Sequence, residues 1–226
     1  MNISRRELAS RIEGTEVNLV TTEKDIRALL KLANQYHFAT VAPAECYHKL
    51  AKDLLEEAGN TETVIVGCCG YPYGTDTTRV KMFQVRNQLA TGCKEMDITN
   101  NLSWLKSGLY SKMDEELKLL VEACEGVPSK VIIEISLLTP DEIKRVCESA
   151  MAAGATFIKT GTGTTGNPTT IEHIQTIKSI VGDTCKVKAS GGVRSLKQIE
   201  ELLAVGADRF GISRPHIMPI LDSIPE

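Results

Sequence analysis

Short runs of apolar and β-branched residues alternate along the chain with longer segments in which apolar residues recur every three or four positions. The short runs predict strands, and the longer segments predict amphipathic helices. Strands are predicted at 37–42, 63–68, 94–99, 130–136, 156–160, 185–190 and 208–213, with a weaker first strand near 12–15. Helices are predicted at 23–36, 45–58, 78–92, 139–154, 170–182 and 195–206. Several of these helices follow Thr or Ser and end at Gly, which are common capping residues.

Three phrases repeat the same order of elements: LATGCKEMDITN, MAAGATFIKTGTG and LAVGADRFGIS. Each ends a helix at Gly and then runs through a strand into small or polar residues. Repeated units of this kind, with about eight strands, favour a closed α/β fold, the (β/α)8 TIM barrel, as a single domain over residues 1–226. An open doubly wound sheet is the alternative. Residues 161–166 match its G-x-G-x-x-G motif, but no acidic residue of the expected kind ends the next strand.

Composition is that of a globular protein, with 42% hydrophobic and 24% charged residues. The net charge of −3 argues against nucleic acid as a partner, because proteins that bind it are usually basic. No apolar run approaches the roughly 18 residues of a membrane span, and the N-terminal segment lacks the apolar core of a signal peptide. We therefore expect a cytoplasmic protein with no nucleic-acid or membrane partner.

The seven cysteines contain no C-x-x-C pair, and the four histidines show neither H-x-H nor H-E-x-x-H spacing. Buried free thiols in a reducing compartment are the simplest interpretation of the cysteines. The sequence therefore predicts no metal site, although ligands that converge from distant strands would leave no such spacing.

Charged residues stand at the predicted ends of several strands, where barrels of this kind hold their active sites. They are Asp97, Glu134, Lys159 and Lys188. A lysine is a nucleophile only as the neutral amine, and both burial and a second ammonium group lower its pKa. The amine condenses with an aldehyde or ketone to an iminium, and a carboxylate such as Asp97 moves protons through a water. The set indicates a metal-independent, class I aldolase.

Each of these residues also has a simpler structural interpretation. Lys159 alone could be a strand-end lysine that extends to solvent, and Lys188 could be one of a solvent-facing pair with Lys186. Asp97 could be an ordinary ion-pair partner, and Glu134 is expected to pair with one of the lysines rather than to act as a catalyst. The coincidence of three strand ends favours the catalytic interpretation.

Two glycine-rich turns, 161–166 and 190–195, indicate an anionic substrate. The second turn, SGGVRS, exposes backbone N–H groups before a helix that Ser195 could cap. Phosphate binds to such N–H groups and to the positive end of a helix. Gly-Gly turns also occur for purely steric reasons.

Five segments stand at successive strands: GYPYGTDTT (70–78), GCKEMDITNN (92–101), KVIIEISLLT (130–139), GATFIKTGTG (154–163) and VKASGGVRS (187–195). Together they resemble the bacterial deoxyribose-phosphate aldolase family, from about residue 8 to residue 212. The resemblance implies a (β/α)8 barrel that reversibly cleaves 2-deoxyribose 5-phosphate to acetaldehyde and glyceraldehyde 3-phosphate. It also implies a phosphosugar as the small-molecule partner and no cofactor.

The resemblance assigns roles by position. Lys159 is expected to form the Schiff base, Lys188 to perturb its pKa, and Asp97 to shuttle protons. The positions expected near the substrate and its phosphate are Thr162, Gly163, Gly191, Gly192, Ser213 and Arg214. Members of the family are commonly dimers or tetramers, so a homo-oligomer is expected.

Several positions depart from the family pattern. Glu13 and Gly14 replace Asp and His near the first strand, and Ala42 replaces a cysteine in the second. The C-terminal segment 220–226 has no tyrosine of the kind that assists proton transfer in some members. The catalytic strands are intact, so these changes leave the Schiff-base prediction in place.

The segment after the eighth strand also departs from the family, because Arg214 and Pro215 replace Ser and Gly. Arg214 has three interpretations: a clamp on the phosphate, a ligand for another anion such as a carboxylate, or a solvent-facing side chain. The acceptor aldehyde is therefore open. A phosphosugar-binding barrel without turnover and a metal-free phosphosugar isomerase or synthase are further alternatives.

Overall fold

The chain forms a closed parallel barrel of eight strands in a computed structural model that describes residues 3–224. Each strand pairs with the next in sequence, and the eighth pairs with the first, so no strand edge is left open. The closed ring confirms the predicted (β/α)8 fold and excludes the open sheet. The first two and last two residues of the predicted domain, 1–226, lie outside the described residues. The strands are β1 (Ile12–Glu16), β2 (Thr40–Pro43), β3 (Val64–Cys69), β4 (Glu95–Thr99), β5 (Ser129–Ile132), β6 (Phe157–Lys159), β7 (Lys186–Ser190) and β8 (Arg209–Ser213).

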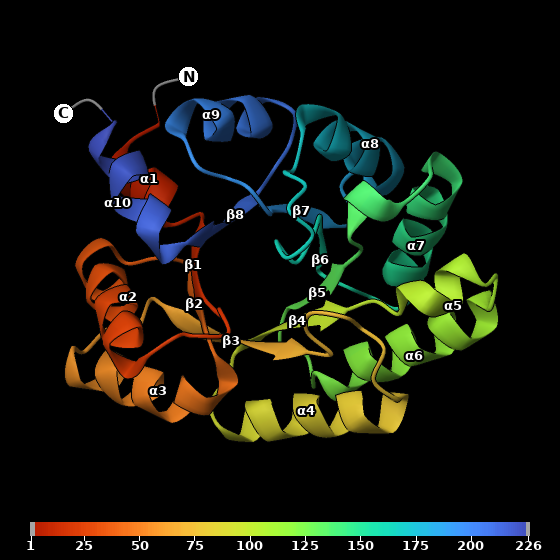
Figure 1. Ribbon diagram of the computed structural model, residues 1–226, viewed down its shortest axis with the longest axis horizontal. Coiled ribbons are helices and arrows are strands. Elements are labelled where there is room, and N and C mark those ends of the chain that lie inside the picture. The colour runs from red at the N-terminus through yellow and green to blue at the C-terminus, as the bar shows by residue number, and fades with distance from the viewer. Residues whose placement is uncertain (1–2, 225–226) are drawn as a thin grey trace.

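The helices surround the barrel as an outer ring (Figure 1). They are α1 (Arg5–Ala9), α2 (Glu23–Tyr36), α3 (His48–Glu57), α4 (Thr78–Ala90), α5 (Leu102–Lys106), α6 (Tyr110–Ala123), α7 (Pro140–Ala152), α8 (Ile171–Val181), α9 (Leu196–Ala204) and α10 (Arg214–Asp222), with 3-10 turns η1 (Glu45–Tyr47) and η2 (Ile135–Leu137). Thr or Ser side chains cap α2, α4, α7, α8 and α9, as the sequence predicts. The predicted helices omit α1, α5, α6 and α10.

Two predicted strands are too long. The chain turns at His37, which has a φ of 54° and ends α2, so β2 begins only at Thr40. Glu134 has a φ of 51° and precedes η2, so β5 ends at Ile132 instead of residue 136. An apolar run alone does not reveal such a bend, because the residues on both sides of it are buried. The bend places Glu134 at the carboxyl end of the barrel.

Two different cores hold the fold together. The layer between barrel and helices is aliphatic and includes Leu29, Val131 and Ile158, all fully buried. The interior of the barrel instead holds ion pairs. Glu95 on β4 and Arg209 on β8 contact each other at 2.9 Å, although these strands lie opposite each other in the ring of eight. Because a buried charge is costly unless it is paired, these contacts offset the cost of enclosing the charged groups in the barrel.

The cysteines only partly match the prediction of buried free thiols. All seven are free, and five of them are buried: Cys69, Cys93, Cys124, Cys147 and Cys185. Cys46 is exposed, so the prediction is wrong for this residue, and Cys68 is half-buried. Over residues 3–224, no helix is long and apolar enough to cross a membrane. In the same range no three His, Cys, Asp or Glu side chains are grouped so that they could hold a metal ion.

We expect Gly74→Ala to destabilise the fold more than Gly59→Ala. Both glycines have a left-handed φ, +70° and +64°, which costs a residue with a Cβ about 1–2 kcal/mol. A Cβ at Gly74 would lie 2.2 Å from the backbone oxygen of Asn100, whereas nothing lies within 4 Å of one at Gly59. The β3–α4 loop would have to move off β4, for a total loss of roughly 3 kcal/mol or more at Gly74. Urea unfolding of both variants measures the difference, and equal losses would contradict this packing.

Candidate active site

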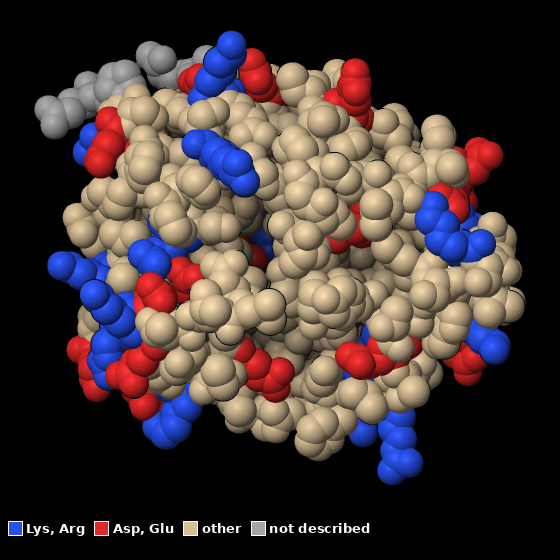
Figure 2. Space-filling model, in the orientation of Figure 1, with Lys and Arg blue, Asp and Glu red and all other residues tan. Residues whose placement is uncertain are grey.

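A cavity of about 690 Å³ opens at the carboxyl end of the barrel. Lys159, the last residue of β6, lines it, and so do five of the residues predicted near the substrate: Thr162, Gly163, Gly191, Gly192 and Ser213. Asp97 and Lys188 lie beneath the cavity and are fully buried. On the face drawn in Figure 2, the charged side chains lie mostly toward the rim of the molecule. The centre of that face consists mainly of uncharged residues.

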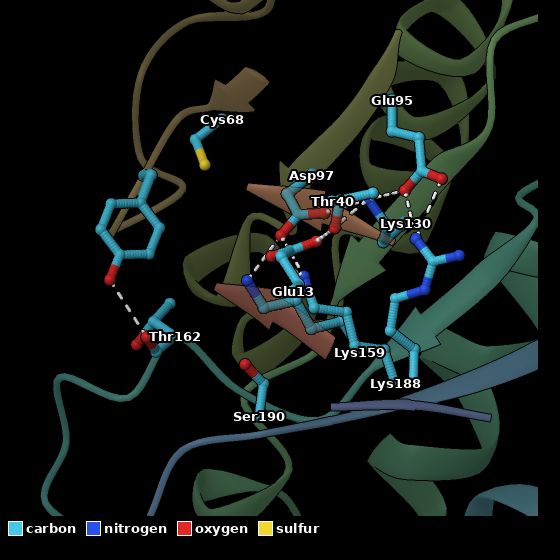
Figure 3. A network of polar contacts seen from close by, with 12 residues as sticks. Glu13, Thr40, Cys68, Glu95, Asp97, Lys130, Lys159, Thr162, Lys188 and Ser190 are labelled. Atoms are coloured by element: carbon cyan, nitrogen blue, oxygen red, sulfur yellow. Dashed lines mark hydrogen bonds and ion pairs between the residues drawn. The ribbon is translucent and has the colours of Figure 1, made fainter. Parts of the chain in front are cut away.

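Asp97 binds three lysines at the centre of the network in Figure 3. Its Oδ2 accepts hydrogen bonds from Lys159 Nζ at 2.6 Å and from Lys188 Nζ at 2.9 Å. Its Oδ1 accepts one from Lys130 Nζ at 2.9 Å. Lys159 is only 4% exposed and Lys188 is fully buried, whereas Lys186 is exposed. The interpretation of Lys159 and Lys188 as solvent-facing lysines is therefore wrong, and the predicted catalytic residues come together as one cluster.

Sequence reasoning missed the other half of this network. Lys130 also binds Glu95 at 2.7 Å and lies 3.5 Å from Glu13. Glu13 accepts a hydrogen bond from Lys188 and another from the Thr40 hydroxyl at 3.1 Å. One signal was present: residues two apart on a strand face the same side, so Glu95 had to face the barrel interior with Asp97. No comparable signal identifies Lys130, which begins an apolar run.

The network carries one more positive than negative charge when every group is ionised. Its three carboxylates are Glu13, Glu95 and Asp97, and its four cations are Lys130, Lys159, Lys188 and Arg209. An uncompensated charge in a buried site is unfavourable, so the loss of one lysine proton balances the network. The barrel interior therefore favours one neutral amine among its lysines.

The lysine whose pKa falls is Lys188, and the expected lowering at Lys159 is wrong for this arrangement. Burial lowers the pKa of Lys188 to about 8, with the charges of Lys159 and Lys130 adding to the effect and those of Asp97 and Glu13 opposing it. Burial also disfavours the charged form of Lys159, but the carboxylates of Asp97 and Glu13 outweigh it and raise its pKa. Burial opposes ionisation of Asp97 too, yet the three lysines hold its pKa well below the usual range.

Glu134 holds the loop after β6 and does not pair with a lysine, contrary to expectation. Its Oε2 accepts hydrogen bonds from the backbone N–H and hydroxyl of Thr162, at 3.0 and 2.5 Å. On the other side of the loop, the Tyr71 hydroxyl donates to the Thr162 carbonyl at 3.0 Å. Burial raises the pKa of Tyr71, so this hydroxyl stays protonated. The residues that follow Lys159 are thus fixed from two directions.

The glycine turn after β7 packs directly on the loop after β6. Gly192 has a φ of +73°, and a Cβ there would lie 2.7 Å from the Cβ of Pro168. Ser195 caps α9 as predicted, accepting a hydrogen bond from the N–H of Gln198. Only glycine fits at residue 192, which explains the Gly-Gly turn partly on steric grounds.

Arg214 is the one predicted site residue that the structure places elsewhere. Its Nε donates to Glu16 at 2.7 Å and its Nη2 donates to Asp25 at 2.8 Å, so the guanidinium joins the end of β1 to the first turn of α2. It is not among the residues that line the cavity. The cavity instead contains Arg194 and His216, which sequence reasoning did not assign to the site.

Comparison with known proteins gives one consistent family. Residues 11–211 match the model of the DeoC/LacD family of aldolases. A deoxyribose-phosphate aldolase of Desulfitobacterium hafniense is 39% identical, over 91% of this chain and 94% of its own. A deoxyribose-phosphate aldolase of Klebsiella pneumoniae is 33% identical, over all of this chain and 91% of its own. Among solved structures, a tetrameric deoxyribose phosphate aldolase of Aeropyrum pernix superposes with a TM-score of 0.88 at 27% identity, covering 98% of this chain and 94% of that one.

We expect Cys68 to resist alkylation although it lines the cavity. Burial and the nearby charge of Asp97 raise the pKa of its thiol to about 12, so the reactive thiolate is scarce at pH 7.5. The exposed Cys46 should react with iodoacetamide at least tenfold faster, as followed by peptide mass spectrometry. Equal or faster labelling of Cys68 would mean that the lysines, and not Asp97, dominate the field at this position.

Proposed function

The chain belongs to the DeoC/LacD family of aldolases, and we propose that it reversibly cleaves 2-deoxy-D-ribose 5-phosphate to acetaldehyde and D-glyceraldehyde 3-phosphate through a Schiff base on Lys159. The observation that carries the proposal is the arrangement of the three lysines. All three surround Asp97, but Lys159 alone among them also lines the cavity. A substrate carbonyl in the cavity therefore meets that amine first.

The chemistry requires an electron sink next to the bond that breaks. The Lys159 amine adds to the C1 aldehyde and loses water, which gives an iminium. The C3 hydroxyl then loses its proton, the C2–C3 bond breaks, and its electron pair moves to the nitrogen as an enamine. Glyceraldehyde 3-phosphate leaves, the enamine is protonated at C2, and water releases acetaldehyde and restores the amine.

Asp97 is placed to move the proton that Lys159 must lose first. Its Oδ2 lies within hydrogen-bonding distance of both Lys159 and Lys188, at 2.6 and 2.9 Å. Because burial lowers the pKa of Lys188 to about 8, roughly a tenth of it is neutral at pH 7, and this fraction accepts a proton from Lys159 by way of the carboxylate. In this proposal Lys188 acts as the proton acceptor, which replaces the expectation that its charge lowers the pKa of Lys159.

The phosphate binds at the end of the cavity formed by the loop after β7 and by the point where β8 passes directly into α10. Gly191, Gly192 and Ser213 line this end, and Arg194 supplies a cation. Ser213 precedes α10 without using its side chain as a cap, so its hydroxyl is available to a ligand. Barrels of this fold often bind phosphate at the segments that follow the seventh and eighth strands and at the start of a short extra helix.

The oligomeric state of the chain and its acceptor aldehyde follow less directly from the site. The related aldolase of Aeropyrum pernix is a tetramer, and we propose that this chain also forms a homo-oligomer. Arg214, which replaces a serine of the family pattern, is bound by Glu16 and Asp25. A second candidate is therefore an aldolase of the same family that uses another acceptor aldehyde in place of glyceraldehyde 3-phosphate. Cleavage rates of phosphorylated and unphosphorylated sugars show whether the acceptor aldehyde carries a phosphate.

Borohydride reduction in the presence of acetaldehyde should attach a two-carbon adduct to Lys159, because only this amine reaches the cavity. Peptide mass mapping locates the adduct, and EDTA should leave its formation unchanged. Lys159→Met should abolish the adduct. Lys188→Met is the matched control: it keeps the nucleophile but should slow trapping at pH 7 by roughly tenfold or more, since the proton acceptor is lost.

An enzyme that turns over without a Lys159 adduct would contradict both aldolase proposals. An adduct without cleavage of any phosphosugar would favour a binding barrel instead.

Arg194→Ala should raise KM for 2-deoxyribose 5-phosphate by about tenfold while leaving KM for 2-deoxyribose nearly unchanged, because the guanidinium contacts only the phosphate. Arg214→Ala is the control, and it should change both KM values by the same factor. Steady-state assays of both variants on both sugars measure the four ratios. If Arg214→Ala raised KM for 2-deoxyribose 5-phosphate but not for 2-deoxyribose, Arg214 would belong to the phosphate site after all.

A further inference from the structure

We propose that the Glu95–Arg209 ion pair, at the opposite end of the barrel from the cavity, controls how readily the lysines beneath the cavity release a proton. The inference rests on the proposed function of Lys159 as the nucleophile. Neither Glu95 nor Arg209 lines the cavity. Both are positioning residues that act through the residues between them and the substrate.

A continuous chain of charges connects this pair to the nucleophile. Arg209 Nη1 donates to both Glu95 oxygens at 2.9 Å, and Glu95 binds Lys130 at 2.7 Å. Lys130 binds Asp97 at 2.9 Å, which in turn binds Lys159 at 2.6 Å. The signs alternate along the chain, so each charge stabilises its neighbour. Figure 3 shows Glu95, Lys130, Asp97 and Lys159 in this order.

The two ends of the chain lie at opposite ends of the barrel. Glu95 and Arg209 are the first residues of β4 and β8, whereas Lys159 is the last residue of β6. Glu95 and Arg209 are 10% and 17% exposed, and the groups between them and Lys159 are fully buried. Arg209 also lies over the ring of Phe157, 5.2 Å from its centroid, with Lys186 near the same ring at 5.7 Å. The pair is therefore held in one geometry.

A charge placed there acts on the lysines because the side chains between them, Lys130 and Asp97, are fully buried. One unit charge at about 10 Å, in an effective dielectric constant of about 20, changes a proton affinity by about one pH unit. Glu95 supplies the third carboxylate of the network and Arg209 the fourth cation. Removing either one changes the charge balance that determines whether one lysine is neutral.

The titratable groups around Lys159 come from five strands and one loop. They are Glu13 on β1, Cys68 on β3, Asp97 on β4, Lys130 on β5 and Lys188 on β7, with Tyr71 on the loop after β3. Glu95→Gln removes one partner of Lys130, at 2.7 Å, and keeps the chemical identity of all six groups. A shift of the pH profile in such variants therefore reports the distal charge.

The test compares Glu95→Gln with Arg209→Gln. Loss of the carboxylate should move the acidic limb of the kcat/KM profile for 2-deoxyribose 5-phosphate down by about one pH unit, since the lysines then lose protons more easily. Loss of the guanidinium should move it up by a similar amount. Arg209→Lys keeps the charge and should leave the limb in place, and the double variant Glu95→Gln, Arg209→Gln should return it to the wild-type position.

A structural role alone predicts a different result, in which both variants lose activity equally at every pH. Unshifted limbs, or limbs shifted in the same direction, would overturn the inference. If one single variant fails to fold, the other still tests the inference against Arg209→Lys and the double variant, because an unshifted limb in that remaining single variant would overturn it.

The titration of the lysine side chains by 15N NMR separates this inference from the proposed function. The lysine of lowest pKa should titrate about one unit lower in Glu95→Gln and higher in Arg209→Gln, whether or not the protein cleaves a sugar. Opposite shifts without a Lys159 adduct would reject the aldolase and keep the electrostatic coupling. A Lys159 adduct together with unchanged lysine pKa values would support the aldolase and reject the electrostatic coupling.

Discussion

The enclosure of seven charged side chains in one barrel, six of them buried and Arg209 partly exposed, is the constraint on which the structure depends. A charge removed from water is tolerated only where an opposite charge and hydrogen bonds replace the lost hydration. Here the replacement comes from across the ring, since Glu95 and Arg209 stand on opposite strands and Glu13 lies 3.5 Å from Lys130 on the far side. Strand closure and ion pairing therefore need each other, because an open sheet would separate these partners.

The same constraint produces reactivity. With three carboxylates and four cations, the network carries one excess positive charge when every group is ionised, and Asp97 Oδ2 contacts the two lysines between which the proposed mechanism moves a proton. A site with equal numbers of both charges would hold all of its lysines as ammonium groups. In the proposed mechanism, the excess of one cation favours release of a proton from a lysine, and the neutral amine is the nucleophile.

The sequence allowed the fold and the centre of the site to be predicted, for different reasons. Period and capping residues indicated eight strands and six of the helices, because those patterns are local. Lys159, Lys188 and Asp97 could be found because each ends or nearly ends a strand. Arg209 could not, since its partner Glu95 lies across the closed ring, and Lys130 could not, since its pairing with Glu95 and Asp97 depends on the register of β4 against β5. Arg214 was assigned to the phosphate for its charge, and only its two carboxylate partners, far away in sequence, reveal its actual contacts.

The separation between Lys159 and the groups beneath it has an evolutionary consequence. The charged network belongs to the strands, whereas most of the residues that line the cavity belong to the loops after β1, β3, β6 and β7. Mutations in the loops alter the shape offered to an incoming aldehyde and leave the proton chemistry intact. Mutations in the strands must preserve the whole charge balance at once. Selection can therefore change the preferred substrate in single steps, while the catalytic interior is inherited as a unit.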